Sequence, residues 1–215
     1  MRQVRSVDYD EVCSYVERLV GDGSEALARV YNESATMKTY DVFSIDPSRG
    51  RLLELITRIR SPKNILEIGP GIGYSALWFL RGASPNTTLD VIEVNPHVAR
   101  KFKQVMAREG CRNKIKIHQG PALEVLAKME KIFDCIFIDA DKNEYPDYLR
   151  HSLRLTRRGS IILADNMFWS DIATGQKKTD LRGVRNYTEM IFKDKRLSSL
   201  IIPLGDGLAI SYRIR

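Results

Sequence analysis

Short apolar runs alternate with helix-like segments through most of this sequence, and this alternation constrains the fold more than any other feature. The runs are rich in β-branched side chains, which favour strands, and they lie at 64–68, 88–93, 114–118, 133–139 and 160–165. Helix-like segments lie between them, near 74–81, 96–109, 121–130 and 145–156. Consecutive strands joined by helices run parallel, because each connection must cross back over the sheet. The pattern therefore predicts an α/β fold whose mostly parallel sheet is covered by helices on both faces.

The N-terminal part adds helices to this core. Residues 8–31 carry apolar side chains at helical spacing, and a Gly-Asp-Gly turn at 21–23 interrupts them. This pattern predicts two N-terminal helices. Asp46 and Pro47 then suit the N-cap and the first position of a third helix.

The C-terminal part ends in two further strands. A helix is expected at 181–194, followed by strands at 198–203 and 208–214. The turn between them, 204–207, contains two glycines and is short enough for a hairpin. The last two strands are therefore expected to pair antiparallel.

The length and composition of the chain are typical of one globular domain. The chain has 215 residues, and we expect the N-terminal helices in 1–45 and the Rossmann-like core in 46–215. No apolar run is long enough to span a membrane, and no apolar segment follows the N-terminal arginines as in a secretory signal. We therefore expect a cytoplasmic protein that has no membrane partner. The net charge of +7 suits either a solvated basic surface or attraction to an anionic partner such as RNA.

The first strand runs into a glycine-rich turn, from Glu67 to Gly73. Glycines let backbone amides approach a ligand closely. The spacing of Gly71, Gly73 and Ala76 also satisfies a dinucleotide-binding pattern, and Glu93 at the end of the second strand suits the ribose of any adenosine ligand. An acid at position 67 would repel a pyrophosphate but suits a positively charged group. S-adenosylmethionine therefore fits better than NAD.

The fourth and fifth strands end in oxygen-bearing side chains. Asp139 ends one, and Asp165 and Asn166 end the other. If these strands are neighbours, the two carboxylates face each other and repel unless a proton or cation lies between them. Hard oxygen ligands suit Mg²⁺, Mn²⁺ or Ca²⁺, although Asp and Asn at strand ends also serve as helix caps. Lys142, three residues after Asp139, suits a general base or a surface ion pair.

Five motifs in this order resemble those of the cation-dependent O-methyltransferase family, which includes caffeoyl-CoA and catechol O-methyltransferases and small bacterial relatives. The motifs are Glu67-Ile-Gly-x-x-x-Gly-Tyr-Ser75, Gly120-Pro-Ala122, Phe137-Ile-Asp-Ala-Asp-Lys142, Ala164-Asp-Asn166 and Ile202-Pro-Leu-Gly-Asp-Gly-Leu208. The resemblance runs from about residue 45 to the C-terminus. It implies a class I methyltransferase fold with seven strands, the last of them antiparallel, and a homodimer.

The resemblance also implies the roles of individual residues. S-adenosylmethionine would contact Ile45, Glu67, Gly69, Gly71, Gly73, Ser75, Glu93, Ala122, Asp139 and Asp141. A divalent cation, Mg²⁺ or else Mn²⁺ or Ca²⁺, would bind Asp139, Asp165 and Asn166, and Lys142 would be the base. Metal coordination would lower the pKa of the substrate hydroxyl, whose oxyanion would then attack the sulfonium methyl.

The acceptor is left open between two substrates. The first is a small catechol-like or hydroxycinnamoyl hydroxyl, and the alternative is hydroxylated uridine in tRNA, which the basic charge would help to bind. Departures from the family pattern at Pro70 and Asp171, and a substrate lid suggested at Trp169–Asp180, concern specificity. An NAD-dependent oxidoreductase and a catalytically silent binding module are weaker alternatives, because each leaves Asp139 and Asp165 without a role.

Overall fold

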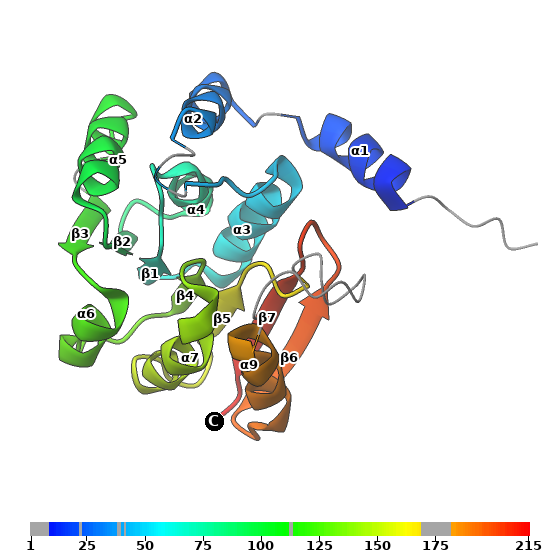
Figure 1. The fold of residues 1–215 in the computed structure, drawn as a ribbon, viewed down its shortest axis with the longest axis vertical. Helices are drawn as coiled ribbons and strands as arrows, with labels where there is room; N and C mark the ends of the chain where they lie inside the picture. Colours follow the sequence, from blue (N-terminus) through cyan, green and yellow to red (C-terminus); the bar gives the residue numbers. More distant parts are fainter. Residues whose placement is uncertain (1–8, 22, 38–39, 41, 112–113, 169–181) are drawn as a thin grey trace, which may run out of the picture.

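A seven-stranded sheet forms the centre of the molecule in the computed structural model (Figure 1). The structure describes residues 9–21, 23–37, 40, 42–111, 114–168 and 182–215. The strand order is β3-β2-β1-β4-β5-β7-β6. The strands are β1 Asn64–Ile68, β2 Thr88–Glu93, β3 Ile115–Gln119, β4 Cys135–Ile138, β5 Ile161–Ala164, β6 Leu197–Ile202 and β7 Leu208–Arg213.

The pairing of the strands confirms the predicted topology. β1 pairs parallel with β2 and β4, β2 with β3, and β4 with β5. β7 runs antiparallel to both β5 and β6, so the C-terminal hairpin is also confirmed. The strand order reverses between β1 and β4, and this is where open α/β sheets bind their ligands.

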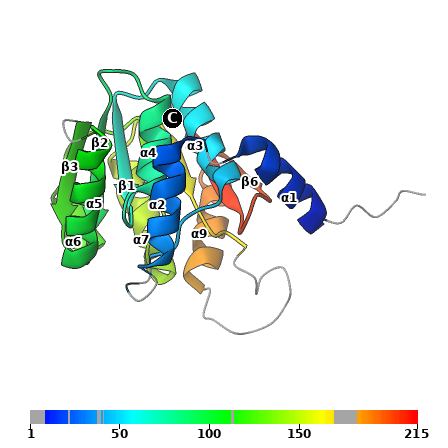
Figure 2. The same cartoon turned by 90° about the horizontal axis from the view of Figure 1, so that it is seen from above.

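Helices cover both faces of the sheet (Figures 1 and 2). They are α1 Tyr9–Val20, α2 Glu25–Ala35, α3 Pro47–Arg60, α4 Tyr74–Gly82, α5 Pro96–Arg108, α6 Ala122–Lys128, α7 Tyr145–Arg154 and α9 Arg182–Lys193, with a short 3₁₀ turn, η3, at Lys142–Glu144. One apolar core joins α2, α3, α4 and α5 to the sheet, and a second joins α6, α7 and α9 to its other face. Alternate residues of β1 enter the two cores: Ile65 belongs to the first, and Leu66 and Ile68 to the second.

The N-terminal helices form as the sequence predicts. Ser24 caps α2 through a hydrogen bond from Leu27 N, and Asp46 caps α3 with Pro47 at its start. Both views place α1 at the side of the molecule opposite β3, beside α3 (Figures 1 and 2). The α1 side chains of Tyr15 and Leu19 are exposed there.

Several predicted elements are shorter in the structure, by one or two residues at an end. The strand expected over 133–139 is assigned as Cys135–Ile138, although Asp134 N and Asp139 N still bond to the carbonyls of β1 residues Asn64 and Ile68. The helix expected over 121–130 ends at Lys128, because Met129 takes an extended conformation with ψ 138°. Both differences lie in the terminal residues of an element.

No helix within the described residues is long and apolar enough to cross a membrane. Cys135 is buried in the first core. Burial raises the pKa of this thiol to about 12, which keeps it protonated and unreactive.

Candidate active site

Glu67 is the first unusual residue at the carboxyl edge of the sheet. It lies on the face of β1 that Ile65 also occupies and is fully buried. Its Oε1 accepts a hydrogen bond from Ser75 in the first turn of α4, while Oε2 is buried and has no hydrogen-bond partner within the described residues. Burial is the main cause that raises the pKa of Glu67 to about 8, with smaller contributions from Asp139 and Glu93. A buried carboxylate oxygen without a donor favours a cationic ligand group.

The glycine-rich turn leaves no room for side chains. Gly69, with φ 84°, lies so close to the end of β4 that a Cβ would come 2.1 Å from the carbonyl oxygen of Asp139. Gly73, with φ 104°, starts α4, and a Cβ there would meet Met106 at 2.4 Å. Gly71 has φ 52° and faces Val42. The turn therefore requires glycine both for its backbone and for its close packing.

Glu93 lies at the end of β2, the strand that pairs with β1 on the side away from β4. It is mostly buried, and its Oε1 accepts a hydrogen bond from Asn95 N at 2.8 Å. Burial raises the pKa of Glu93, and the backbone hydrogen bonds from Asn95 and Val94 oppose that rise. β1 and β2 pair in register, so Glu67 and Glu93 flank the glycine turn from neighbouring strands. This brings together the sequence-predicted cofactor residues Glu67, Gly69, Gly71, Gly73, Ser75 and Glu93.

Asp139 and Lys142 lie at the end of β4, beside the same turn. Lys142 Nζ donates to Asp139 Oδ1 at 2.7 Å and to Tyr145 Oη at 2.8 Å. Both charged side chains keep partial exposure, 19% for Asp139 and 15% for Lys142. The pair therefore has access to solvent and to a ligand, while its rear side is fixed by a buried tyrosine.

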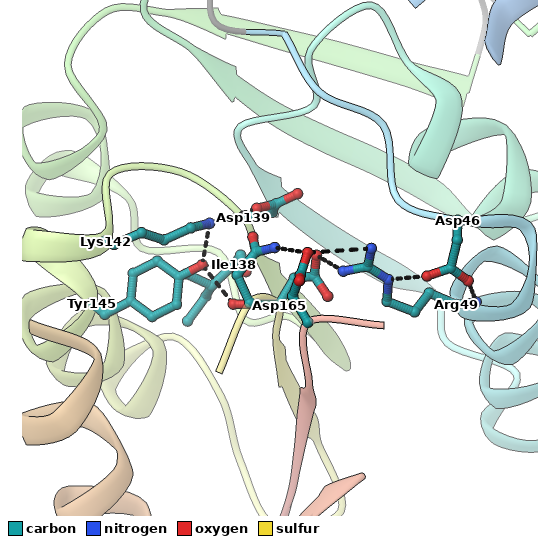
Figure 3. Close-up of polar contacts among 9 residues, drawn as sticks. Asp46, Arg49, Ile138, Asp139, Lys142, Tyr145 and Asp165 are labelled. Carbon is teal, nitrogen blue, oxygen red and sulfur yellow. Dashed lines mark hydrogen bonds and ion pairs between the residues drawn. The ribbon is translucent and has the colours of Figure 1, made fainter. Parts of the chain in front are cut away.

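Asp165 lies next to Asp139, because β4 and β5 are neighbours in register. It is buried, and its Oδ2 accepts a hydrogen bond from Arg49 Nη1 at 2.6 Å. Burial and the nearby Asp139 raise the pKa of Asp165, while Arg49 opposes that rise. Figure 3 shows Asp165 between Arg49 on one side and Tyr145 and Lys142 on the other.

The predicted metal ligands are brought together, but their oxygens are partly engaged. Asp165 Oδ1 is buried without a hydrogen-bond partner in the described part of the chain, which would suit a cation. Asp165 Oδ2 already binds Arg49, and Asp139 Oδ1 binds Lys142. Asn166, with φ 59°, donates to Asp206 Oδ2 at 3.3 Å. In this arrangement the donor set does not fit a divalent ion, and the metal site stays a prediction.

The described residues contain no group of three or more Asp, Glu, His or Cys side chains that could hold a metal ion. The set predicted from the sequence contains only two carboxylates and one amide. Any ion there would depend on Asn166 and would either lie beside Arg49 or displace it.

Three of the predicted cofactor residues are placed less closely to the turn. Ile45 is buried in the first core, and Ala122 is half-buried at the start of α6. Asp141 is exposed, and its side chain accepts from Asn143 N at 2.9 Å as the cap of η3. No contact in the structure tests their role toward a cofactor, which stays a prediction. Trp169–Asp180, the suggested lid, and Asp171 lie outside the described residues.

Sequence reasoning missed two residues of the site, Arg49 and Tyr145. Tyr145 Oη donates to the carbonyl oxygen of Asp165 at 3.0 Å and accepts from Lys142. Arg49 lies in the first turn of α3, where the helix dipole makes a positive charge unfavourable. This unfavourable position is the sequence signal that could have indicated a role for Arg49 in the site. Tyr145 carries no such signal, because a buried aromatic residue in a helix reads as core.

The strand order and the glycine turn between β1 and α4 define a Rossmann-like methyltransferase fold. Comparison with known families narrows this class. The sequence profile of the O-methyltransferase family matches residues 18–214, which is most of the chain. The chain belongs to this family, and the resemblance seen in its motifs is confirmed.

Individual relatives agree with this assignment. A catechol O-methyltransferase of Niastella koreensis is 29% identical over 214 residues, which are 94% of this chain and 96% of the relative. The crystal structure of the O-methyltransferase TomG of Streptomyces achromogenes, in complex with SAM, matches with TM-score 0.83 and 27% identity over 95% of this chain and 96% of its own. That of an O-methyltransferase from Bacillus cereus, in complex with SAH, matches with TM-score 0.84 and 27% identity, covering 94% and 97%.

Proposed function

We propose that the protein transfers a methyl group from S-adenosylmethionine to a hydroxyl of a small aromatic, catechol-like or hydroxycinnamoyl, substrate. The observation that carries the proposal is the partly exposed pair of Lys142 and Asp139, 2.7 Å apart beside the glycine turn. The pair offers a place for a proton next to the expected sulfonium. The catechol O-methyltransferase of Niastella koreensis supports this choice of acceptor.

The cofactor site fits S-adenosylmethionine on the observations of this chain. Glu67 Oε2 is a buried acceptor without a donor in the described residues, which suits the α-amino group of the cofactor. The tight turn from Gly69 to Gly73 lies where the strand order reverses between β1 and β4, which is where open α/β sheets bind their ligands. Glu93 suits the ribose hydroxyls. The SAM and SAH complexes of the two structural neighbours support the same cofactor.

Methyl transfer then needs one base and good alignment. The hydroxyl oxygen attacks the sulfonium methyl, the S–CH₃ bond breaks as the O–CH₃ bond forms, and S-adenosylhomocysteine leaves. Lys142 gives a proton to Asp139 across their hydrogen bond and takes up the hydroxyl proton in its place, so that Lys142 stays an ammonium and the carboxylate of Asp139 ends protonated. Tyr145 holds Lys142 from behind through its hydroxyl. Alignment of the two reactants supplies much of the rate enhancement.

The tRNA alternative is not favoured by the charge distribution. The basic side chains of the hollow between α7 and α9, which has a volume of about 720 Å³, are Arg150, Arg154, Lys193 and Arg196. Three of them pair with acidic neighbours in Arg150–Asp147, Lys193–Glu189 and Arg196–Asp194. The fourth, Arg154, donates to backbone carbonyls. Positive charge that is balanced locally attracts phosphates weakly.

The test is methyl transfer by the purified protein to a panel of catechols, hydroxycinnamoyl compounds and unmodified tRNA. Product is measured by mass spectrometry. Lys142→Met is expected to lower kcat by about 10²- to 10⁴-fold, the usual range for loss of a general base. Lys193→Met, an exposed lysine on α9, is the matched control and should leave the rate unchanged. Methylation of tRNA alone, falling steeply with salt, would contradict the proposal.

A homodimer is part of the same proposal. Apolar side chains are exposed on the two neighbouring helices α1 and α3, with Tyr15 and Leu19 on α1 and Ile59 on α3 at 84% exposure. Helix faces of this kind are usually covered by a partner. Light scattering over a range of protein concentrations measures the mass in solution.

A further inference from the structure

Arg49 lies inside the acidic cluster that the sequence predicts as a metal site. It comes from the first turn of α3, 116 residues before Asp165 in the chain. Its Nη1 donates to Asp165 Oδ2 and its Nε to Asp46 Oδ2, each at 2.6 Å (Figure 3). The side chain is only 8% exposed. The guanidinium is therefore buried between carboxylates of two different elements.

The turn between β6 and β7 is shaped around this guanidinium. A Cβ on Gly205 would lie 2.7 Å from Arg49 Nε and 2.6 Å from Asp46 Oδ2. The next residue, Asp206, has its Oδ2 3.9 Å from Arg49 Nη2 and accepts from Asn166 Nδ2. Three segments of the chain thus enclose Arg49, which is part of the site and not a surface side chain folded over it.

The cluster already has its own positive charges. Arg49 pairs with Asp165, and Lys142 pairs with Asp139, so each of the two carboxylates predicted to hold a metal has a protein cation on one oxygen. An arginine cannot give up its proton in a protein. A divalent ion on Asp165 would therefore either displace a buried guanidinium or sit beside it, and like charges at close range disfavour binding.

We propose that Arg49 is a built-in cation that takes the place of a divalent metal at Asp165, so that methyl transfer by this protein needs no metal ion. The proposal rests on the proposed function and deepens it. Arg49 is a positioning residue: it balances the charge of Asp165, whose carbonyl oxygen accepts from Tyr145, the partner of Lys142. Lys142 and Asp139 meet the substrate hydroxyl.

Binding of Mn²⁺ to the full-length protein tests this without any substrate. Free Mn²⁺ is followed by electron paramagnetic resonance in the presence of S-adenosylhomocysteine. The wild-type protein is expected to bind no Mn²⁺ at millimolar concentration, whereas Arg49→Gln should gain at least about tenfold in affinity, because a like charge is removed from beside Asp165. Adding Asp165→Asn to Arg49→Gln should abolish the gained site. Arg51→Gln is the matched control on the same helix, since Arg51 pairs with Glu54 away from the site.

A second variant covers the case in which Arg49→Gln does not fold. Asp46→Asn keeps a residue suited to cap α3 but weakens the hold on Arg49, and it should give an intermediate gain in Mn²⁺ binding. The proposal is overturned if neither variant binds more Mn²⁺ than the wild type. It is also overturned if wild-type methyl transfer is lost in excess EDTA and restored by Mg²⁺. Failure of the proposed function looks different: no acceptor is methylated with or without metal, while the Mn²⁺ result stands.

Discussion

Two buried carboxylates at the same edge of the sheet are treated differently by this protein. Glu67, at β1, is fully buried, and one of its oxygens has no donor in the described residues. Asp165, after β5, is equally buried and also has one oxygen without a donor in the described residues, but its other oxygen bonds to the cationic Arg49 at 2.6 Å, whereas Glu67 bonds to the neutral hydroxyl of Ser75. Burial raises the pKa of Glu67 to about 8. The fold itself balances the charge of Asp165 with Arg49, whereas it leaves the charge of Glu67 to be balanced by a ligand.

Removing the carboxylate with a partner should have the largest effect on the fold. Asp165→Asn is expected to lower the free energy of unfolding by about 3 kcal/mol, because one partner of a buried ion pair is left uncompensated. The loss stays near the lower end of the usual range, since Asp46 still binds Arg49. Urea unfolding followed by circular dichroism measures the change.

The matching change at the other carboxylate should be small. At about pH 6, Glu67→Gln is expected to change the free energy of unfolding by less than about 1 kcal/mol, because a neutral acid is replaced by a neutral amide. Equal losses in both variants would mean that the two carboxylates are held alike, and the comparison would fail.

Much of this contrast follows from the sequence. Glu67 is visible as an acid inside an apolar strand before a glycine turn, and alternation of strands and helices places Asp139 beside Asp165. Local patterns are enough here, because strand spacing and parallel order are properties of consecutive residues.

The third prediction concerns the protonation of Glu67 and its effect on cofactor binding. Its folded pKa of about 8 lies above the ordinary 4.5, so the native state holds a proton that the unfolded state releases between these values. The free energy of unfolding should therefore fall as pH rises through this window, by at most about 1.4 kcal/mol per pH unit. A cationic α-amino group favours the ionised acid, so the affinity for S-adenosylhomocysteine should rise with pH toward 7.5, below the pKa of about 8 of an α-amino group.

Calorimetry separates this linkage from other effects. Titration of S-adenosylhomocysteine in two buffers of different ionisation enthalpy should show release of up to one proton per site near neutral pH. Glu67→Gln should bind more weakly and release no proton. A wild-type protein that binds with no proton release would show that Glu67 is already ionised or lies away from the cofactor.

The pairing of Arg49 with Asp165 could not be predicted from the sequence, for a physical reason. Its partner is 116 residues away, and a long flexible side chain can reach several strand ends from the start of α3. Which one it reaches depends on how α3 packs on the sheet, and that packing is set by both cores together. Asp141 caps η3 in this structure, and its role toward the cofactor stays a prediction.

A pair of glycine substitutions tests how tightly the chain is built around Arg49. Gly205 and Gly21 have nearly the same backbone conformation, with φ 55° and φ 60°. A Cβ on Gly21 meets nothing within 4 Å, whereas one on Gly205 meets Arg49 and Asp46. Alanine at either position should lower the free energy of unfolding by about 1 kcal/mol through backbone strain alone. Gly205→Ala is expected to cost about 1 kcal/mol more, since the overlap must push the guanidinium away from Asp165. Parallel urea unfolding of both variants gives the difference directly, and equal losses would show that the turn yields without disturbing Arg49.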